Sequence, residues 1–190
     1  MTVEQIFSKI SAHMIQGLMF HEQTANYYDF LGLKGYKRMH EYHYFEESVA
    51  FRKLNRYYIN NHCKLIEESE VEDPKVIPRN WYNYKRDDVD PNTKRNSIKT
   101  SMEAWKTWEA ETLELYEKSY KELISIDEVA AALFIKGMIY DVEHELKDVK
   151  RKILDLDTIE YDFSVIIPHQ EELHELYSHK TRELKLDFEY

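Results

Sequence analysis

The stretch GLKGYKRMHEYHYFEE, residues 32–47, decides the fold, because in it a helix stop is followed by the start of a second long helix. Gly32 is a typical residue just past a helix C-terminus, since glycine adopts the left-handed conformation found there. From Tyr36 to about Glu70 no proline or glycine interrupts the chain, and apolar residues recur at the spacing of one helix face. The stretch therefore predicts a helical hairpin that turns at about 32–35.

Capping signals predict where the long helices begin. Three pairs match the Ser/Thr-x-x-Glu/Gln pattern of a capping box: Thr2 with Gln5, Thr100 with Glu103, and Ser125 with Glu128. Each pair precedes a long apolar repeat at helical spacing. The first predicts a helix over 3–31, which completes the first hairpin. The other two predict a second hairpin, with helices over 101–123 and 126–156 and a tight turn at about 124–125.

A long irregular connection, about 71–97, joins the two predicted hairpins. It is marked by turn-forming residues, namely Pro74, Pro78, Asn80, Asn83, Asp87, Asp88, Pro91 and Asn92. Its apolar residues indicate that it packs on the body of the protein: Val76, Ile77, Trp81, Tyr82 and Tyr84. A connection of this length can cross from one end of a bundle to the other, so the second and third helices are expected to run parallel.

The C-terminal part, 157–190, is predicted as an extension of the bundle formed by 1–156. Its first stretch, 158–167, is predicted to be extended. Pro168 fits the first position of a helix, because its missing N–H would lack a partner there anyway. A short fifth helix is therefore predicted to run from Pro168 to about Leu184.

Composition excludes several function classes. The 190 residues carry 36 acidic and 26 basic side chains, a net charge of −10, which argues against nucleic-acid binding. No apolar run approaches the ~18 residues of a membrane span, and no Gly-rich phosphate loop occurs. The one cysteine, Cys63, excludes an internal disulfide framework and Cys-based zinc sites. With no signal-peptide pattern at the N-terminus, a cytoplasmic protein is expected.

Polar residues on the buried stripes are the informative ones. They are His13, His21, Glu22, His43, Glu46, Glu47, Glu109, Asp141, His144 and Glu145. Residues equally far from a hairpin turn face each other, so His21 or Glu22 is expected opposite Glu46, and Glu109 opposite Asp141. Both sets fall near mid-length of the bundle, in one polar layer. Glu47, Glu111 and Glu145 are interpreted as solvated.

Carboxylates and imidazoles together suit iron, manganese or zinc. Asp141 and His144 are three residues apart, as are His43 and Glu46, so each pair can grip one ion from a single helix. The alternative interpretation is that these buried acids, histidines and tyrosines form a metal-free hydrogen-bond network.

The two hairpins with a long crossover, and the segment MHEYHYFEE at 39–47, resemble the ferritin-like superfamily of ferritins, bacterioferritins and di-iron carboxylate proteins. The resemblance implies an all-α fold: a ferritin-like antiparallel four-helix bundle of two helical hairpins with a long crossover, plus a C-terminal fifth helix. In that family the helices supply a Glu, a Glu-x-x-His, a second Glu and a second Glu-x-x-His.

Carried onto this sequence, the family pattern implies the metal ligands Glu22 (or His21), His43, Glu46, Glu109, Asp141 and His144. The sequence departs from the pattern in two places. Val49 follows three residues after Glu46, so His43 would serve from the other side, and Asp141 replaces a Glu.

The function implied by the resemblance is metal binding, with two iron ions and iron oxidation or storage-type chemistry at a carboxylate and histidine centre inside the bundle. Manganese or zinc would also suit the ligands. If the protein is an enzyme, it would be a ferroxidase-like oxidoreductase, and a homo-oligomer is expected. The alternative is a non-enzymatic oligomerisation or partner-binding module whose central polar residues form a metal-free hydrogen-bond network.

Overall fold

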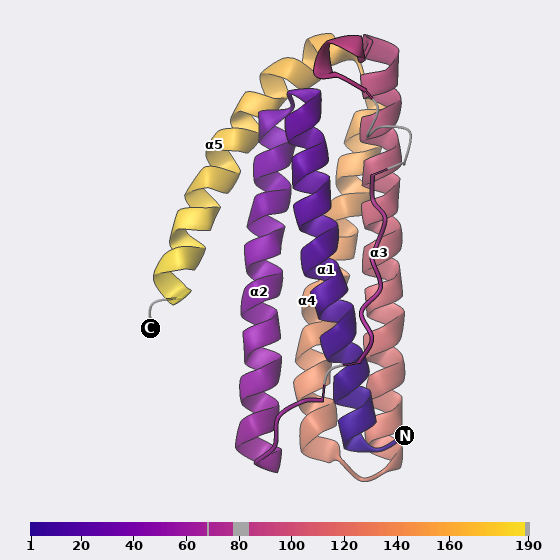
Figure 1. Cartoon of the computed structure of the whole chain (residues 1–190), viewed down its shortest axis with the longest axis vertical. Coiled ribbons are helices and arrows are strands. Elements are labelled where there is room, and N and C mark those ends of the chain that lie inside the picture. Colours follow the sequence, from indigo (N-terminus) through magenta and orange to yellow (C-terminus); the bar gives the residue numbers. More distant parts are fainter. Residues whose placement is uncertain (68, 78–83, 189–190) are drawn as a thin grey trace.

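A computed structural model describes residues 1–67, 69–77 and 84–188, and in these residues the chain forms five long helices and no strand (Figure 1). The helices are α1 (Val3–Leu31), α2 (Lys34–His62), α3 (Pro91–Ser125), α4 (Val129–Thr158) and α5 (Phe163–Phe188). A short 3-10 turn, η2 (Arg86–Asp88), precedes α3. None of the helices in the described residues has an apolar stretch that could cross a bilayer.

The first hairpin forms as predicted at its start and its turn. Thr2 and Gln5 make the reciprocal capping box at the start of α1, and Gly32 ends it with φ 78°. The predicted end of α2 at Glu70 is wrong. The helix stops at His62, where Cys63 adopts a left-handed conformation with φ 54° and its N–H binds the Ile59 carbonyl.

The second hairpin begins earlier than predicted. Asp90 caps α3 by accepting hydrogen bonds from the N–H groups of Asn92 and Thr93, and Pro91 occupies the first turn. Residues 91–97 are therefore helical, and Thr100 lies inside α3 rather than at its cap.

The turn of the second hairpin also lies later than predicted. Ser125 is the last residue of α3, and its hydroxyl donates to the Glu122 carbonyl instead of capping α4. The turn lies at 126–128, with Asp127 at φ 62°. Its centre is thus two to three residues past the predicted 124–125, which shifts the register between α3 and α4.

The crossover returns along the bundle, so that α2 and α3 run in the same direction, as predicted (Figure 1). Val76 and Ile77 pack against the core, which confirms that this part of the crossover lies on the body of the protein. Tyr84 is instead 43 % exposed. Trp81 and Tyr82 lie outside the described residues, as do Pro78, Asn80 and Asn83.

The C-terminal extension differs from its prediction. The stretch predicted as extended is largely helical, because α5 starts at Phe163 and spans 26 residues, with Pro168 inside it. The Asp162 side chain accepts a hydrogen bond from the Ser164 N–H and so supports the start of the helix. The fifth helix is therefore present but neither short nor begun by Pro168.

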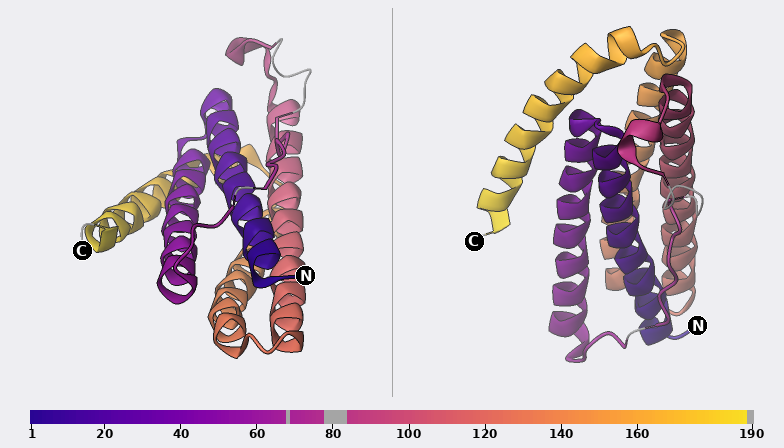
Figure 2. Two further views of the ribbon diagram at one scale, coloured as in Figure 1. Left: turned by 60° about the horizontal axis from the view of Figure 1, so that its bottom comes forward. Right: turned by 45° about the horizontal axis from the view of Figure 1, so that its top comes forward.

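Helix α5 packs against α2 (Figure 2). The close approach depends on Gly35, because a Cβ placed there would lie 2.0 Å from the carbonyl oxygen of Gln170. Helices α1 and α2 pack together, as do α3 and α4, and α1 joins the hairpins through α3. Helices α2 and α4 contact each other little, so a groove opens between them.

The apolar core is divided into two clusters. One contains Met39 and Trp105 among its buried residues, and the other contains Leu54 and Tyr116. Between these levels the helices carry acidic residues, on α2, α3 and α4. The fold thus places a polar layer near the middle of the bundle, beside the groove between α2 and α4.

Candidate metal centre

Four glutamates from three helices form the centre of the polar layer: Glu46 and Glu47 on α2, Glu109 on α3 and Glu145 on α4. Glu109 is only 1 % exposed, while the others are partly buried. Glu46, Glu47 and Glu145 line a cavity of about 440 Å³ that opens in the groove between α2 and α4. The hairpin turns and the groove therefore bring the carboxylates together near a solvent-accessible space.

Hydrogen bonds hold two of these carboxylates in place. The indole N–H of Trp105 donates to Glu109 Oε1 at 2.7 Å. The Tyr42 hydroxyl donates to Glu46 Oε1, and His43 Nδ1 lies 3.0 Å from Glu46 Oε2. The second carboxylate oxygen of Glu109, Oε2, is buried and has no hydrogen-bond partner among the described residues. The buried His43 Nε2 likewise has no hydrogen-bond partner among these residues.

The cluster gathers carboxyls that have no neutralising basic partner among the described residues, and their pKa values are raised. Burial, with the charges of Glu145 and Glu46 added, raises the pKa of Glu47 to about 8. Burial and the charge of Glu47 raise the pKa of Glu109 to about 8 as well. The pKa of Glu145 lies well above its usual range because of burial and the nearby charges of Glu109, Glu46 and Asp141. Such carboxyls hold protons near neutral pH unless a cation replaces them.

Three donors lie close to the spacing that one ion requires. One ligand atom each from His43, Glu46 and Glu145 lie within 4.8 Å of one another. Donor atoms that share an ion at metal–ligand distances of about 2.0–2.2 Å are separated by no more than roughly twice that distance. A slight inward movement of the side chains would therefore complete this set.

Two predicted ligands lie at the edge of the centre. Asp141 and His144 are both exposed, although they line the same cavity as Glu46 and Glu145. The His144 ring packs edge-on against Tyr140, with ring centroids 4.4 Å apart. Asp141 reaches the centre through its charge, which helps to raise the pKa of Glu145.

Helix α1 contributes no carboxylate to the centre. Glu22 is exposed, and its Oε1 accepts a hydrogen bond from Asn26 at 3.3 Å. The α1 residue that faces the acids is Gly17, where a Cβ would lie 3.4 Å from the Glu47 carboxyl carbon. The structure therefore does not bring Glu22 to the other predicted ligands.

His21, the alternative to Glu22, belongs to a buried histidine group with His40 and His43. His21 Nδ1 lies 3.0 Å from His40 Nδ1, and the rings of His21 and His43 stack at 5.5 Å between centroids. Trp105 contacts all three rings. Burial holds the pKa of both His21 and His40 well below the usual histidine range, so both are neutral.

His13 is a satisfied core residue. Its Nε2 lies 2.7 Å from the Thr112 hydroxyl, and its ring stacks on Trp108 at 4.3 Å. Burial lowers its pKa to about 4.

The sequence interpretation of Glu47 and Glu145 as solvated is wrong. Glu145 faces Glu109 because both stand equally far from the real turn at 126–128. With the turn predicted two to three residues earlier, Asp141 took that place. Helical spacing counted from the true turn would have identified Glu145 as the residue opposite Glu109. The capping pattern of Ser125 with Glu128 instead predicted a turn at 124–125, which is too early.

The fold of this chain is similar to the folds of archaeal ferritins in solved structures. A closed form of the Archaeoglobus fulgidus ferritin made by site-directed mutagenesis is 15 % identical, with a TM-score of 0.74 over 92 % of this chain and 96 % of that one. A humanized archaeal ferritin gives 14 % identity and a TM-score of 0.75, over 90 % and 94 % of the two chains. The open-pore ferritin of Archaeoglobus fulgidus gives 15 % identity and a TM-score of 0.73, over 90 % and 93 %. No protein-family model and no curated protein sequence matches the chain.

Proposed function

We propose, from the premise that this chain has the ferritin-like fold, that it binds a pair of iron ions at the carboxylate centre between α2, α3 and α4 and supports their oxidation or storage. The observation that carries the proposal is the cluster Glu47, Glu109 and Glu145. These three carboxyls have raised pKa values and no cationic side chain bonded to them among the described residues.

The donor set fits a hard or borderline cation. Carboxylates and an imidazole are ligands for iron, manganese and zinc. Placing several carboxylates together is unfavourable unless protons or a cation neutralise them. In the part of the chain that the structure describes, Glu109 Oε2 and His43 Nε2 have no hydrogen-bond partner, so both remain available as metal donors.

Different residues would hold the ions in different ways. Glu109 and Glu145 stand opposite each other on α3 and α4 and would hold the ions from that side. Glu46 and His43 would bind from the α2 side. Trp105 and Tyr42 would orient Glu109 and Glu46 through their hydrogen bonds, as outer partners do for metal ligands.

Bound iron would supply the electrons that dioxygen takes. The cavity of about 440 Å³ gives the centre access to solvent. Asp141 and His144 at its edge would capture arriving Fe(II), since both line the cavity and are exposed. We therefore assign them to entry, with the inner glutamates as the resident ligands.

The alternative is a metal-free hydrogen-bond network. It draws on the satisfied bonds Trp105–Glu109 and Tyr42–Glu46. Under this alternative the buried glutamates remain protonated and serve only the packing. Replacing them by glutamine would then leave the structure unchanged or more stable, with no ion lost.

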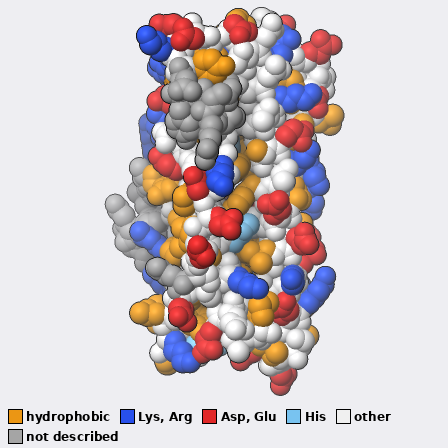
Figure 3. All heavy atoms as spheres, turned by 45° about the vertical axis from the view of Figure 1, so that its right-hand side comes forward, with side chains coloured by type: hydrophobic (Ala, Val, Ile, Leu, Met, Phe, Trp, Pro, Cys, Tyr) orange, Lys and Arg blue, Asp and Glu red, His pale blue; other side chains and the backbone are white. Residues whose placement is uncertain are grey.

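Self-association is the second part of the proposal. On the solvent side of α4, the large apolar side chains of Leu133, Tyr140 and Leu154 are 60 %, 62 % and 65 % exposed. They recur at multiples of seven residues and so share one stripe of the helix. On the face drawn in Figure 3, acidic and basic side chains are interspersed with hydrophobic ones. We propose that copies of the chain associate through the α4 stripe.

The test of the metal centre is an aerobic Fe(II) titration that follows ferric absorbance. The wild type is compared with a Glu109→Gln and Glu145→Gln double variant, in which glutamine keeps the size and the acceptor for Trp105. Glu22→Gln is the matched control, because Glu22 is an exposed glutamate outside the centre. Oxidation faster than in buffer that is lost only in the double variant supports the proposal; equal rates in all three proteins oppose it.

A further inference from the structure

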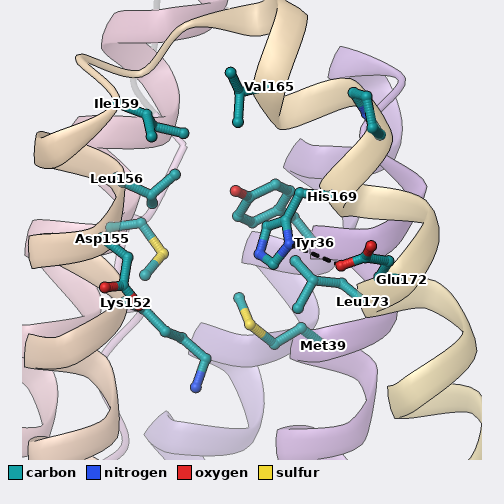
Figure 4. Close-up of a pocket in the computed structure, with 12 residues that line it drawn as sticks. Tyr36, Met39, Lys152, Asp155, Leu156, Ile159, Val165, His169, Glu172 and Leu173 are labelled. Carbon is teal, nitrogen blue, oxygen red and sulfur yellow. Dashed lines mark ion pairs between the residues drawn. The ribbon is translucent and has the colours of Figure 1, made fainter.

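A second cavity, largely apolar, lies between α2, α4 and α5 (Figure 4). Its volume is about 400 Å³, within the range of small-molecule sites. Its apolar wall consists of Met39, Met102, Leu156, Ile159, Val165, Pro168 and Leu173. The carboxylate centre described above uses none of these residues.

The walls of this cavity are held apart by the packing of α5. Gly35 lets the backbone of α5 approach α2 at Gln170, directly after Pro168 and His169 in the cavity wall. Ile166 and Leu173 on α5 are buried in the same core cluster as Met39. Helix α5 is therefore held against the body of the protein on both sides of the cavity, so the cavity is a fixed part of the fold.

Two hydrogen-bond donors serve the cavity. The ring of Tyr36 reaches into it with the hydroxyl directed at the space, and Lys152 lies at its lower edge (Figure 4). Among the described residues neither group has a hydrogen-bond or ion-pair partner. The Lys152 ammonium instead lies 6.0 Å from the centroid of the Trp105 ring.

An anionic ligand group would meet one lysine in the cavity wall, Lys152, although the charges of Asp148 and Asp155 also act on it. Lys152 is partly buried, and burial lowers its pKa. Its acidic neighbours in the wall, Asp155 and Glu172, are exposed to water, and Glu172 already pairs with His169 at 3.5 Å. A cationic ligand would meet the ammonium of Lys152, whereas a carboxylate would form an ion pair with it.

We propose that this cavity binds a small amphipathic carboxylate. Its apolar part would lie among Met39, Leu156 and Leu173. Its carboxylate would pair with the Lys152 ammonium at the lower edge of the cavity (Figure 4). The ligand class is a medium-chain aliphatic acid, because the wall offers aliphatic and thioether side chains beside a lysine ammonium.

Octanoate is the probe, titrated into the full chain by calorimetry in the presence of a chelator. The chelator makes the result independent of the iron proposal, whose own titration is read separately. We expect one octanoate per chain. Lys152→Met should weaken octanoate binding at least tenfold while leaving the binding of neutral 1-octanol unchanged.

Two further variants locate the binding. Lys150→Met is the matched control, since Lys150 is an exposed lysine of the same helix that does not line the cavity; it should bind octanoate as the wild type does. Val165→Trp fills the cavity from its exposed side and should abolish binding of both probes without unfolding the protein. The proposal is overturned if octanoate does not bind, if the two lysine variants bind equally, or if Val165→Trp leaves binding unchanged.

Discussion

Glu109 on α3 and Glu145 on α4 stand equally far from the turn that joins their helices, and the charge of Glu109 adds to burial in raising the pKa of Glu145. Two carboxyls placed in this way cannot both ionise cheaply inside a protein. The pair therefore needs either protons or a cation, and this choice governs both the stability and the chemistry of the bundle.

The stability of the metal-free protein should fall as the pH rises from 6.5 to 8. In this range the folded protein keeps protons on Glu47 and Glu109, whose pKa values are about 8, while the unfolded chain has lost them. Because the folded state binds more protons, the unfolding free energy decreases with pH. Below pH 6.5 the neutral buried His21 and His40 act in the opposite direction, since they protonate only on unfolding.

Urea unfolding at pH 6.5 and pH 8, with a chelator present, measures this dependence. The Glu109→Gln and Glu145→Gln double variant should show a smaller decrease than the wild type, because two of the titrating groups are gone. A wild-type stability that is flat or rises over this range would contradict the pKa directions on which the centre is built.

Gly35→Ala should release α5 from α2. The new methyl group would lie 2.0 Å from a backbone carbonyl of α5, a contact that no side-chain movement relieves. We expect a lower melting temperature and faster proteolysis within 163–188. Gly137→Ala is the control: nothing lies within 4 Å of a Cβ there, so alanine in the helix interior should stabilise the protein by about 0.5–1 kcal/mol. Equal melting temperatures for the two variants would argue against the docking of α5.

Trp105→Phe should destabilise the protein more than Trp108→Phe. Trp105 donates its N–H to the buried Glu109, whereas the Trp108 N–H is buried without a partner among the described residues. Only Trp105→Phe leaves the buried Glu109 carboxyl without its hydrogen-bond donor, which should lower the unfolding free energy by about 1–3 kcal/mol. Comparing the unfolding free energies of the two variants at pH 6.5 tests whether the Trp105 hydrogen bond supports the centre.

Charge on the solvent side of α4 should prevent self-association. Leu133→Glu combined with Tyr140→Glu places two carboxylates on an exposed apolar stripe, so folding should not suffer. Sedimentation velocity should show the wild type as an oligomer and the double variant as a monomer, with the same helical circular dichroism. Leu65→Glu, at a residue 80 % exposed outside this stripe, should leave the oligomer intact. An unchanged oligomer in the α4 variant would place the interface elsewhere.

The hairpin architecture could be predicted from local signals, because Gly32 and the box of Thr2 with Gln5 act over a few residues. The start of α3 was missed since Pro91 was interpreted as part of a connection, although Asp90 before it supplies a cap. Pro168 is likewise typical of a helix start, but it lies inside α5. It is tolerated inside α5, where it removes one backbone hydrogen bond while α5 packs on α2.

The candidate site depends on register, which local signals specify poorly. The polar layer and the residues Glu46, Glu109 and His43 were predicted from helix periodicity. Because the second turn lies two to three residues later than predicted, Glu145 replaces Asp141 opposite Glu109. On α1, Glu22 lies on the exposed side next to the buried His21, and Gly17 is the α1 residue beside Glu47.

The most direct test of the central claim is to count the Fe(II) ions bound per chain by anaerobic equilibrium titration. The wild type should bind two ions, the Glu109→Gln and Glu145→Gln double variant should lose this stoichiometric binding, and Glu22→Gln should retain it. Fewer than one ion per wild-type chain, or the same number in the double variant, would contradict the claim and leave the carboxyls as a protonated structural network.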